Sequence, residues 1–178
     1  MTNINLYETS LSIENSIIRY TFESTGKSKL IKAVEYSRLK TKSGDTIYNL
    51  GFGDYNSEDK TISDKENSNN GDMRKVFNTV LSTVPEFFKV FPYFPIFIQG
   101  SDSHALFEQE CRNSCLKKCQ KICKNKNRRI RTYGHFLNKN FKEFSKNYIF
   151  FGFNEEEKKF VSYEVKNKYS AILIYKKK

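Results

Sequence analysis

Four cysteines follow one another at intervals of four residues, and a histidine precedes them. They are Cys111, Cys115, Cys119 and Cys123, with His104 seven residues before the first. On a helix this spacing places the thiols in one stripe on one face. One interpretation is that these small apolar side chains form the packing face of a short helix. The other is that neighbouring thiolates, with His104, bind zinc or copper(I), and one straight helix would then need a second helix or a second copy of the chain to complete the site.

The segment around and after these cysteines is strongly basic. Residues 112–146 contain 12 Lys or Arg and one acid, Glu143, whereas residues 1–100 contain 12 basic and 12 acidic residues. An ordinary exposed helix mixes both signs and gains ion pairs one turn apart. A solvated lysine-rich surface is one interpretation. A phosphate-rich partner is the other, and it accounts for the missing acids.

Residues 128–148 predict an amphipathic helix with a basic face. At about 100° per residue, cations fall on one side and the apolar residues Ile130, Leu137 and Phe141 fall on the other. We therefore expect one face to dock on a core and the other to present cations. The candidate nucleic-acid-binding residues are Lys117, Lys118, Lys121, Arg128, Arg129, Arg131, His135, Lys139, Lys142 and Lys146.

Catalytic motifs are scarce. The sequence contains no P-loop and no metalloprotease helix, and Gly51-Phe52-Gly53 lacks the further glycines of a dinucleotide fingerprint. A metal-independent ribonuclease needs a base or acid and cations that stabilise the charged transition state. Arg131, Tyr133 and His135 are the candidates for these roles, and the sequence leaves open whether the protein is an enzyme.

The elements that position these residues predict an α+β fold. At 178 residues the chain suits a single domain over 1–178. β-branched and aromatic runs at 16–23 and 29–36 predict a hairpin, and the spacing of apolar residues from Met73 to Phe88 predicts a helix that Pro85 kinks or ends. Strands grouped before and after the helices predict a mostly antiparallel sheet of about six strands, with two main helices on one face and an inserted basic, Cys-bearing helix.

The sequence shows no targeting or membrane signal. It has no run of 18 apolar residues, and Met1–Leu6 has neither the basic start nor the apolar run of a signal peptide. We therefore expect a cytoplasmic protein without a membrane partner, whose thiols are kept reduced.

Several short runs resemble a family of small bacterial proteins, mostly from Bacteroidetes, which is catalogued only as a domain of unknown function. The runs are Asn49-Leu50-Gly51-Phe52-Gly53-Asp54, Asn69-Asn70-Gly71-Asp72 before Lys75-Val76, Gln99-Gly100-Ser101, Arg129-Ile130-Arg131 with Tyr133, and Tyr169. In the family, the Gly-Ser run precedes the Arg-containing run by only a few residues. The resemblance therefore implies that residues 102–127 are an insertion. It also implies a common site where a strand end meets a helix start, and we expect Ser101, Arg129, Arg131 and Tyr133 to form an anion pocket there.

Two functional hypotheses follow. The first is a nucleic-acid-binding protein, most naturally for RNA, in which Tyr133 and His135 stack on unpaired bases. Its size and the family resemblance suggest a toxin-like member of a bacterial two-gene module with a cognate protein partner. The second is a protein-interaction module that pairs through the Cys-bearing helix, with or without metal. The oligomeric state is open.

Overall fold

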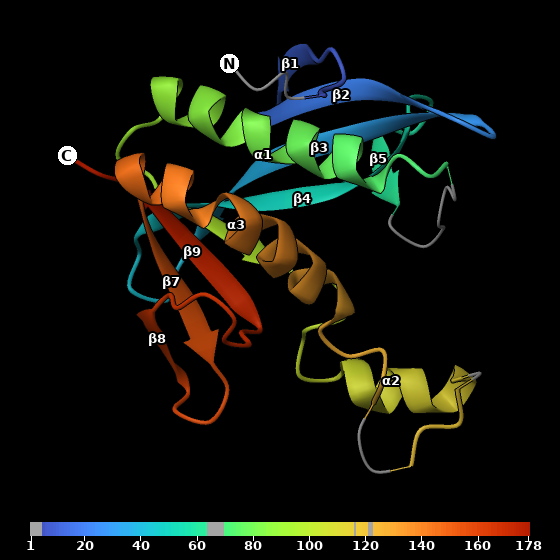
Figure 1. Cartoon of the computed structure of the whole chain (residues 1–178), viewed down its shortest axis with the longest axis vertical. Coiled ribbons are helices and arrows are strands. Elements are labelled where there is room, and N and C mark those ends of the chain that lie inside the picture. Colours follow the sequence, from blue (N-terminus) through green and yellow to red (C-terminus); the bar gives the residue numbers. More distant parts are fainter. Residues whose placement is uncertain (1–4, 64–69, 116, 121–122) are drawn as a thin grey trace. The chain divides into compact units, whose positions relative to one another are not determined.

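The computed structural model describes residues 5–63, 70–115, 117–120 and 123–178 (Figure 1). The chain divides into two compact units, Met1–Ile96 and Phe97–Lys178. The sequence predicts that residues 1–178 form a single domain. That the two units combine into one domain stays a prediction. The described residues contain nine strands and three helices. The predicted α+β class and the mostly antiparallel pairing are confirmed, but the prediction of about six strands is wrong.

The first unit is built on antiparallel strands. Their order is β1-β2-β3-β4, and β5 pairs with the C-terminal end of β4. Tyr20 of β2 lies opposite Val34 of β3, which in turn lies opposite Phe52 of β4. The short outer strands β1 and β5 are mostly exposed, so they lack the buried apolar alternation that reveals a strand in a sequence. The bounds are β1 Ser10–Glu14, β2 Ile17–Thr25, β3 Lys29–Lys40, β4 Thr46–Asn56 and β5 Thr61–Ser63.

Helix α1 (Met73–Val90) covers one face of these strands (Figure 1). The fully buried ring of Tyr36 in β3 stacks on Phe87 with centroids 4.5 Å apart. The Tyr36 hydroxyl shares a 2.8 Å hydrogen bond with Thr83 Oγ1, which itself donates to the Val80 carbonyl. Burial of an aromatic ring with a satisfied hydroxyl stabilises this core. The helix runs on past Pro85, because Phe87 in its last turns is anchored in the core.

The Asn-Gly-Asp motif has a structural role at the start of α1. One carboxylate oxygen of Asp72 accepts hydrogen bonds from the hydroxyls of Tyr7 at 2.7 Å and Ser24 at 2.6 Å. The side-chain amide of Asn70 also donates to Ser24 Oγ, at 3.0 Å. A Cβ at Gly26 would lie 2.6 Å from Asn70 Cβ, so only glycine allows this close approach. The motif therefore fastens the segment before α1 to β2.

The second unit pairs β7 with a strand on each side. β8 and β9 both run antiparallel to β7, and β6 follows on the far side of β9. Helix α3 (Arg128–Asn147) leads directly into β7, and its Phe141 ring lies 5.5 Å from the rings of both Phe150 and Tyr163. The strand bounds are β6 Ile96–Gln99, β7 Tyr148–Asn154, β8 Lys159–Ser162 and β9 Ala171–Lys176.

The predicted Cys-bearing helix is much shorter than the spacing of the four cysteines indicates. Helix α2 spans Phe107–Ser114, so it contains Cys111 alone, and Cys115 ends it in an extended conformation. The prediction of one four-cysteine stripe on a helix is therefore wrong. The lysine-rich sequence after Ser114 offers no acid for ion pairs along a helix. Instead, polar groups farther along the chain donate to the thiols, as the backbone N–H of Lys124 does to Cys119 Sγ at 3.3 Å.

Candidate functional site

Helix α3 presents a basic face to solvent. Its buried residues are Ile130, Phe136 and Leu137, so these side chains do not belong to the exposed basic face. The acid on this helix, Glu143, accepts a 2.6 Å hydrogen bond from Lys146, so the basic charge is reduced only near the C-terminal end. The predicted nucleic-acid-binding residues that the structure leaves exposed on this face are Arg128, Arg131, His135, Lys139, Lys142 and Lys146.

The start of α3 is capped by a residue far away in the sequence. The buried Asp102 accepts a 3.0 Å hydrogen bond from the backbone N–H of Arg129 on its carboxylate, and one of 3.0 Å from Asn127 on its carbonyl. Gly100 makes room for this arrangement, because a Cβ there would lie 2.5 Å from the Asp102 carboxylate. Asp102 thus supplies the anion that the helix N-terminus favours.

The four residues of the predicted anion pocket do not all converge. The Arg129 guanidinium donates to Ser101 Oγ, so the strand end and the helix start do meet. Burial lowers the pKa of Arg129. Arg131 turns towards its own helix start and donates to the carbonyls of Asn127 at 3.1 Å and Lys126 at 3.0 Å. Burial raises the pKa of the Tyr133 hydroxyl, which therefore stays protonated and unsuited to act as a base.

A hollow of about 190 Å³ lies between α3 and the connection from β8 to β9. Arg131, His135 and Asn138 line it from the helix, and Lys166, Lys168 and Tyr169 line it from the connection. No Asp or Glu is among the described residues that line it. Four groups that are cationic or become so on protonation therefore surround a concave surface, which favours an anion.

Two tyrosines and a glycine shape this hollow. The Tyr163 and Tyr169 rings lie 4.9 Å apart, and the Tyr163 hydroxyl donates to Asn138 Oδ1 at 2.9 Å. Burial raises the pKa of Tyr163 to about 12, so it remains neutral. A Cβ at Gly152 would lie 2.3 Å from the Tyr169 ring, so β7 needs a glycine under this ring. Sequence reasoning missed Lys166 and Lys168 because they look like an ordinary polar turn.

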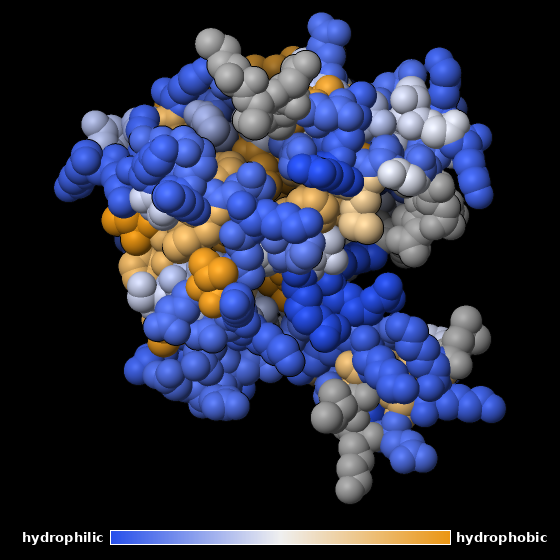
Figure 2. Space-filling model, in the orientation of Figure 1, coloured by the Kyte–Doolittle hydropathy of each residue, from blue (hydrophilic) through white to orange (hydrophobic). Residues whose placement is uncertain are grey.

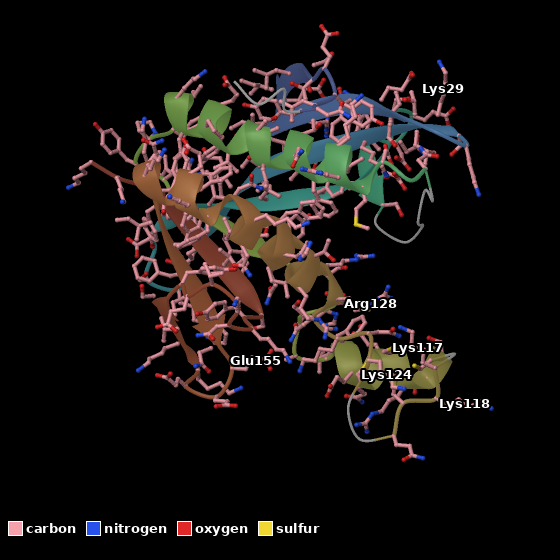
Figure 3. The ribbon with its side chains drawn as sticks, viewed as in Figure 1. Lys29, Lys117, Lys118, Lys124, Arg128 and Glu155 are labelled. Atoms are coloured by element: carbon pink, nitrogen blue, oxygen red, sulfur yellow. The ribbon has the colours of Figure 1, made fainter. Side chains whose placement is uncertain are left out.

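The segment after α2 carries further exposed cations. Figure 3 labels Lys117, Lys118 and Lys124 along it, and Figure 2 shows hydrophilic residues over much of its visible face. Lys126 Nζ lies 3.9 Å from the carboxylate of Glu155 and is partly neutralised. The remaining predicted cation, Lys121, lies outside the described residues.

The predicted metal-binding residues are only partly together. Cys115 Sγ and Cys119 Sγ lie 3.7 Å apart, and Asn125 Nδ2 donates to Cys111 Sγ at 3.3 Å. His104 faces Glu110 at 3.4 Å, with its ring edge-to-face on Phe107. Within residues 5–63, 70–115, 117–120 and 123–178, no three His, Cys, Asp or Glu side chains form a group suited to hold a metal ion.

A family model matches residues 3–106, more than half of the chain. Its description is a family of unknown function, DUF6934. The chain belongs to this family. The DUF6934 match contains the runs at 49–54 and 69–72. It stops before Arg129, Arg131, Tyr133 and Tyr169, which are also among the residues on which the family resemblance was based. No curated protein and no solved structure matches the chain.

The part of the chain that matches DUF6934 and the part that follows it differ in net charge. Residues 3–106 contain 12 basic and 13 acidic residues, whereas 107–178 contain 19 basic and 7 acidic residues. The positive excess therefore lies entirely outside the matched part. Among the described helices, none combines the length and apolar character required to cross a membrane.

Proposed function

We propose that the protein binds single-stranded nucleic acid, most naturally RNA, through the exposed face of α3 and the hollow beside it. The observation that carries this proposal is the hollow, where Arg131, His135, Lys166 and Lys168 meet without a carboxylate among the described lining residues. A phosphate is the ligand group that this charge distribution favours, because neutralising it releases condensed counterions.

The exposed face of α3 extends this surface. The cations Arg128, Arg131, Lys139 and Lys142, with His135 between them, follow the helix in rows one turn apart, a spacing of about 5.4 Å. Repeated phosphates of one strand pair with such a row. The exposed His135 ring, which also lines the hollow, offers a surface on which an unpaired base stacks.

The ribonuclease version of this proposal rests on Arg131 and His135 alone. Both line the hollow, whereas Tyr133 is not among its lining residues and burial raises the pKa of its hydroxyl. In this version His135 acts as base or acid and Arg131 stabilises negative charge on the phosphorus. The toxin-like role and the cognate partner stay predictions from size and resemblance.

The experiment is a binding measurement with a fluorescently labelled single-stranded RNA oligonucleotide. Replacing Lys139 and Lys142 with Ala removes two exposed cations from α3. The matched control replaces Lys40 and Lys42, two exposed cations of the first unit, with Ala. If both α3 lysines contact phosphates, the slope of log affinity against log salt falls by about 1.4 in the first variant and stays unchanged in the control.

Two outcomes contradict the proposal. Equal slopes in both variants would place the RNA away from α3. A partner whose binding affinity hardly depends on salt would favour the alternative function, a protein-interaction module around α2. None of the eight residues of α2 is buried, so the helix is open to such a partner.

A further inference from the structure

The segment after α2 brings two thiols together at a chain reversal. Cys115 Sγ and Cys119 Sγ lie 3.7 Å apart, and both residues are half-buried, so small reagents reach them. Between them the backbone N–H of Lys118 donates to the Cys115 carbonyl at 3.2 Å, and Lys118 adopts a left-handed φ of 45°. This turn, rather than a helix, sets the approach of the sulfurs.

The two thiols have separate hydrogen-bond donors. Cys119 Sγ accepts from the backbone N–H of Lys124 at 3.3 Å, and Cys115 Sγ lies 3.8 Å from Asn125 Nδ2. Hydrogen bonds from the backbone of Cys119 and then of Lys117 lower the pKa of Cys115 to about 7. A thiol with that pKa is about half ionised at neutral pH, and the thiolate is the nucleophilic form.

Cys111 differs from its neighbour. Asn125 Nδ2 donates to its sulfur and lowers its pKa, but burial and the thiols of Cys123 and Cys115 outweigh that hydrogen bond and raise the pKa overall. Cys115 is therefore a better nucleophile than Cys111. An ionised, accessible cysteine beside a second thiol is the usual arrangement of a redox-sensitive pair.

We propose that Cys115 and Cys119 form a reversible intrachain disulfide when the protein meets a hydroperoxide. The Cys115 thiolate attacks one peroxide oxygen, the O–O bond breaks, and the leaving hydroxide takes up a proton to form water. Cys115 is then a sulfenic acid. Cys119 sulfur attacks the Cys115 sulfur, the S–O bond breaks, and the departing hydroxide combines with the Cys119 proton to form a second water. The two thiols lose two electrons, hydrogen peroxide gains them, and a dithiol reductant reverses the reaction.

Trypsin separates the four cysteines, which makes the pairing directly measurable. Cleavage after Lys and Arg places Cys115 in peptide 113–117 and Cys119 in peptide 119–121, whereas Cys111 and Cys123 fall in other peptides. The full chain is reduced, treated with a chelator and exposed to hydrogen peroxide. The proposal predicts that peptides 113–117 and 119–121 become joined, that free thiols fall from four to two per chain, and that dithiothreitol restores them.

Two variants check the roles of the thiols. Cys119→Ser removes the second thiol, so Cys115 should accumulate as a sulfenic acid that dimedone traps. Cys111→Ser is the matched control, and it should form the same 115–119 link as the wild type. Alkylation of the wild type by iodoacetamide needs no variant. At neutral pH Cys115 should react roughly three- to sixfold faster than an ordinary thiol, because greater ionisation outweighs its lower intrinsic nucleophilicity.

Three results would overturn the proposal. One is a dominant link between any other pair of cysteines. Another is oxidation of Cys115 to sulfinic acid without any link. The third is stoichiometric zinc in the purified protein that protects all four thiols until a chelator removes it and that returns on reconstitution, because the cluster would then be a metal site.

Discussion

The carboxylate of Asp102 accepts a 3.0 Å hydrogen bond from the backbone N–H of Arg129, although 27 positions separate the two residues. This contact ties the segment directly after β6 to the start of α3. It also supplies a negative charge at the helix N-terminus, so that part of the predicted anion pocket is occupied by the protein itself. The basic surface that remains for a ligand lies farther along α3 and beside the β8–β9 connection.

Replacing Asp102 with Ala should destabilise the protein by about 1–2 kcal/mol, because a buried helix cap and its hydrogen bond are lost. Urea unfolding followed by circular dichroism measures the loss. Asp45→Ala is the control, since Asp45 is an exposed turn residue with the same charge. Equal losses in the two variants would show that Asp102 does not cap α3.

Gly152→Ala should destabilise the second unit by about 1–3 kcal/mol, because its Cβ overlaps the Tyr169 ring and the strand or the ring must move. Gly51→Ala is the matched strand substitution, and its Cβ meets no atom within 4 Å. We expect it to be neutral or to stabilise the protein slightly. Thermal unfolding of both variants compares them, and the reverse order of stability would contradict the packing of Tyr169 on Gly152.

Lys166→Gly should have opposite effects on stability and on binding. Lys166 has a left-handed φ of 79°, so glycine relieves strain and should stabilise the protein by about 1 kcal/mol. The same change removes a cation from the hollow and should weaken RNA binding. Lys158→Gly, at another left-handed position outside the lining of the hollow, should stabilise the protein similarly without weakening RNA binding. Unchanged affinity in Lys166→Gly would exclude the hollow from the interface.

The stability of the first unit should fall at acidic pH because of Asp72. Burial raises the pKa of this carboxyl group, but hydrogen bonds from Ser24 and Tyr7 outweigh burial, so the folded-state pKa is lowered. Its contribution is therefore complete above the unfolded-state value of about 3.9 and is lost as the pH falls below it. Unfolding of the wild type and Asp72→Asn between about pH 2 and 6 should show a steeper acid loss in the wild type. Parallel curves would contradict the role of Asp72.

Local patterns in the sequence predicted the α1 helix and the β2–β3 hairpin, because both follow from apolar spacing. The same spacing rule failed for the cysteines. Their intervals of four fit a helix, yet the chain leaves α2 at Cys115. The thiols of Cys119 and Cys111 instead accept hydrogen bonds from the Lys124 backbone N–H and from Asn125 Nδ2, which the spacing alone does not indicate. The sequence predicts that Pro85 kinks or ends α1, but the helix continues to Val90, and Phe87 in its last turns is buried.

The candidate site was predictable only on α3 itself. Helical periodicity gives the exposed face from Arg128 to Lys146, since one element carries all of it. Periodicity cannot identify Asp102 as the cap or Lys166 and Lys168 as the opposite wall of the hollow, because folding brings these residues to α3 from other segments. Tyr133 and His135 lie two positions apart, so they point to different sides of the helix, one half-buried and one exposed.

The most direct test of RNA binding is a salt titration of the full chain with a single-stranded RNA oligonucleotide. If the three cations around the hollow, Arg131, Lys166 and Lys168, contact phosphates, log affinity should fall with log salt with a slope of about −2.1, and additional contacts along α3 would steepen it. Measurements on the Lys139→Ala/Lys142→Ala variant and on its first-unit control then locate the contacts. A slope near zero, or no retention of RNA or single-stranded DNA even at low salt, would contradict the proposed function.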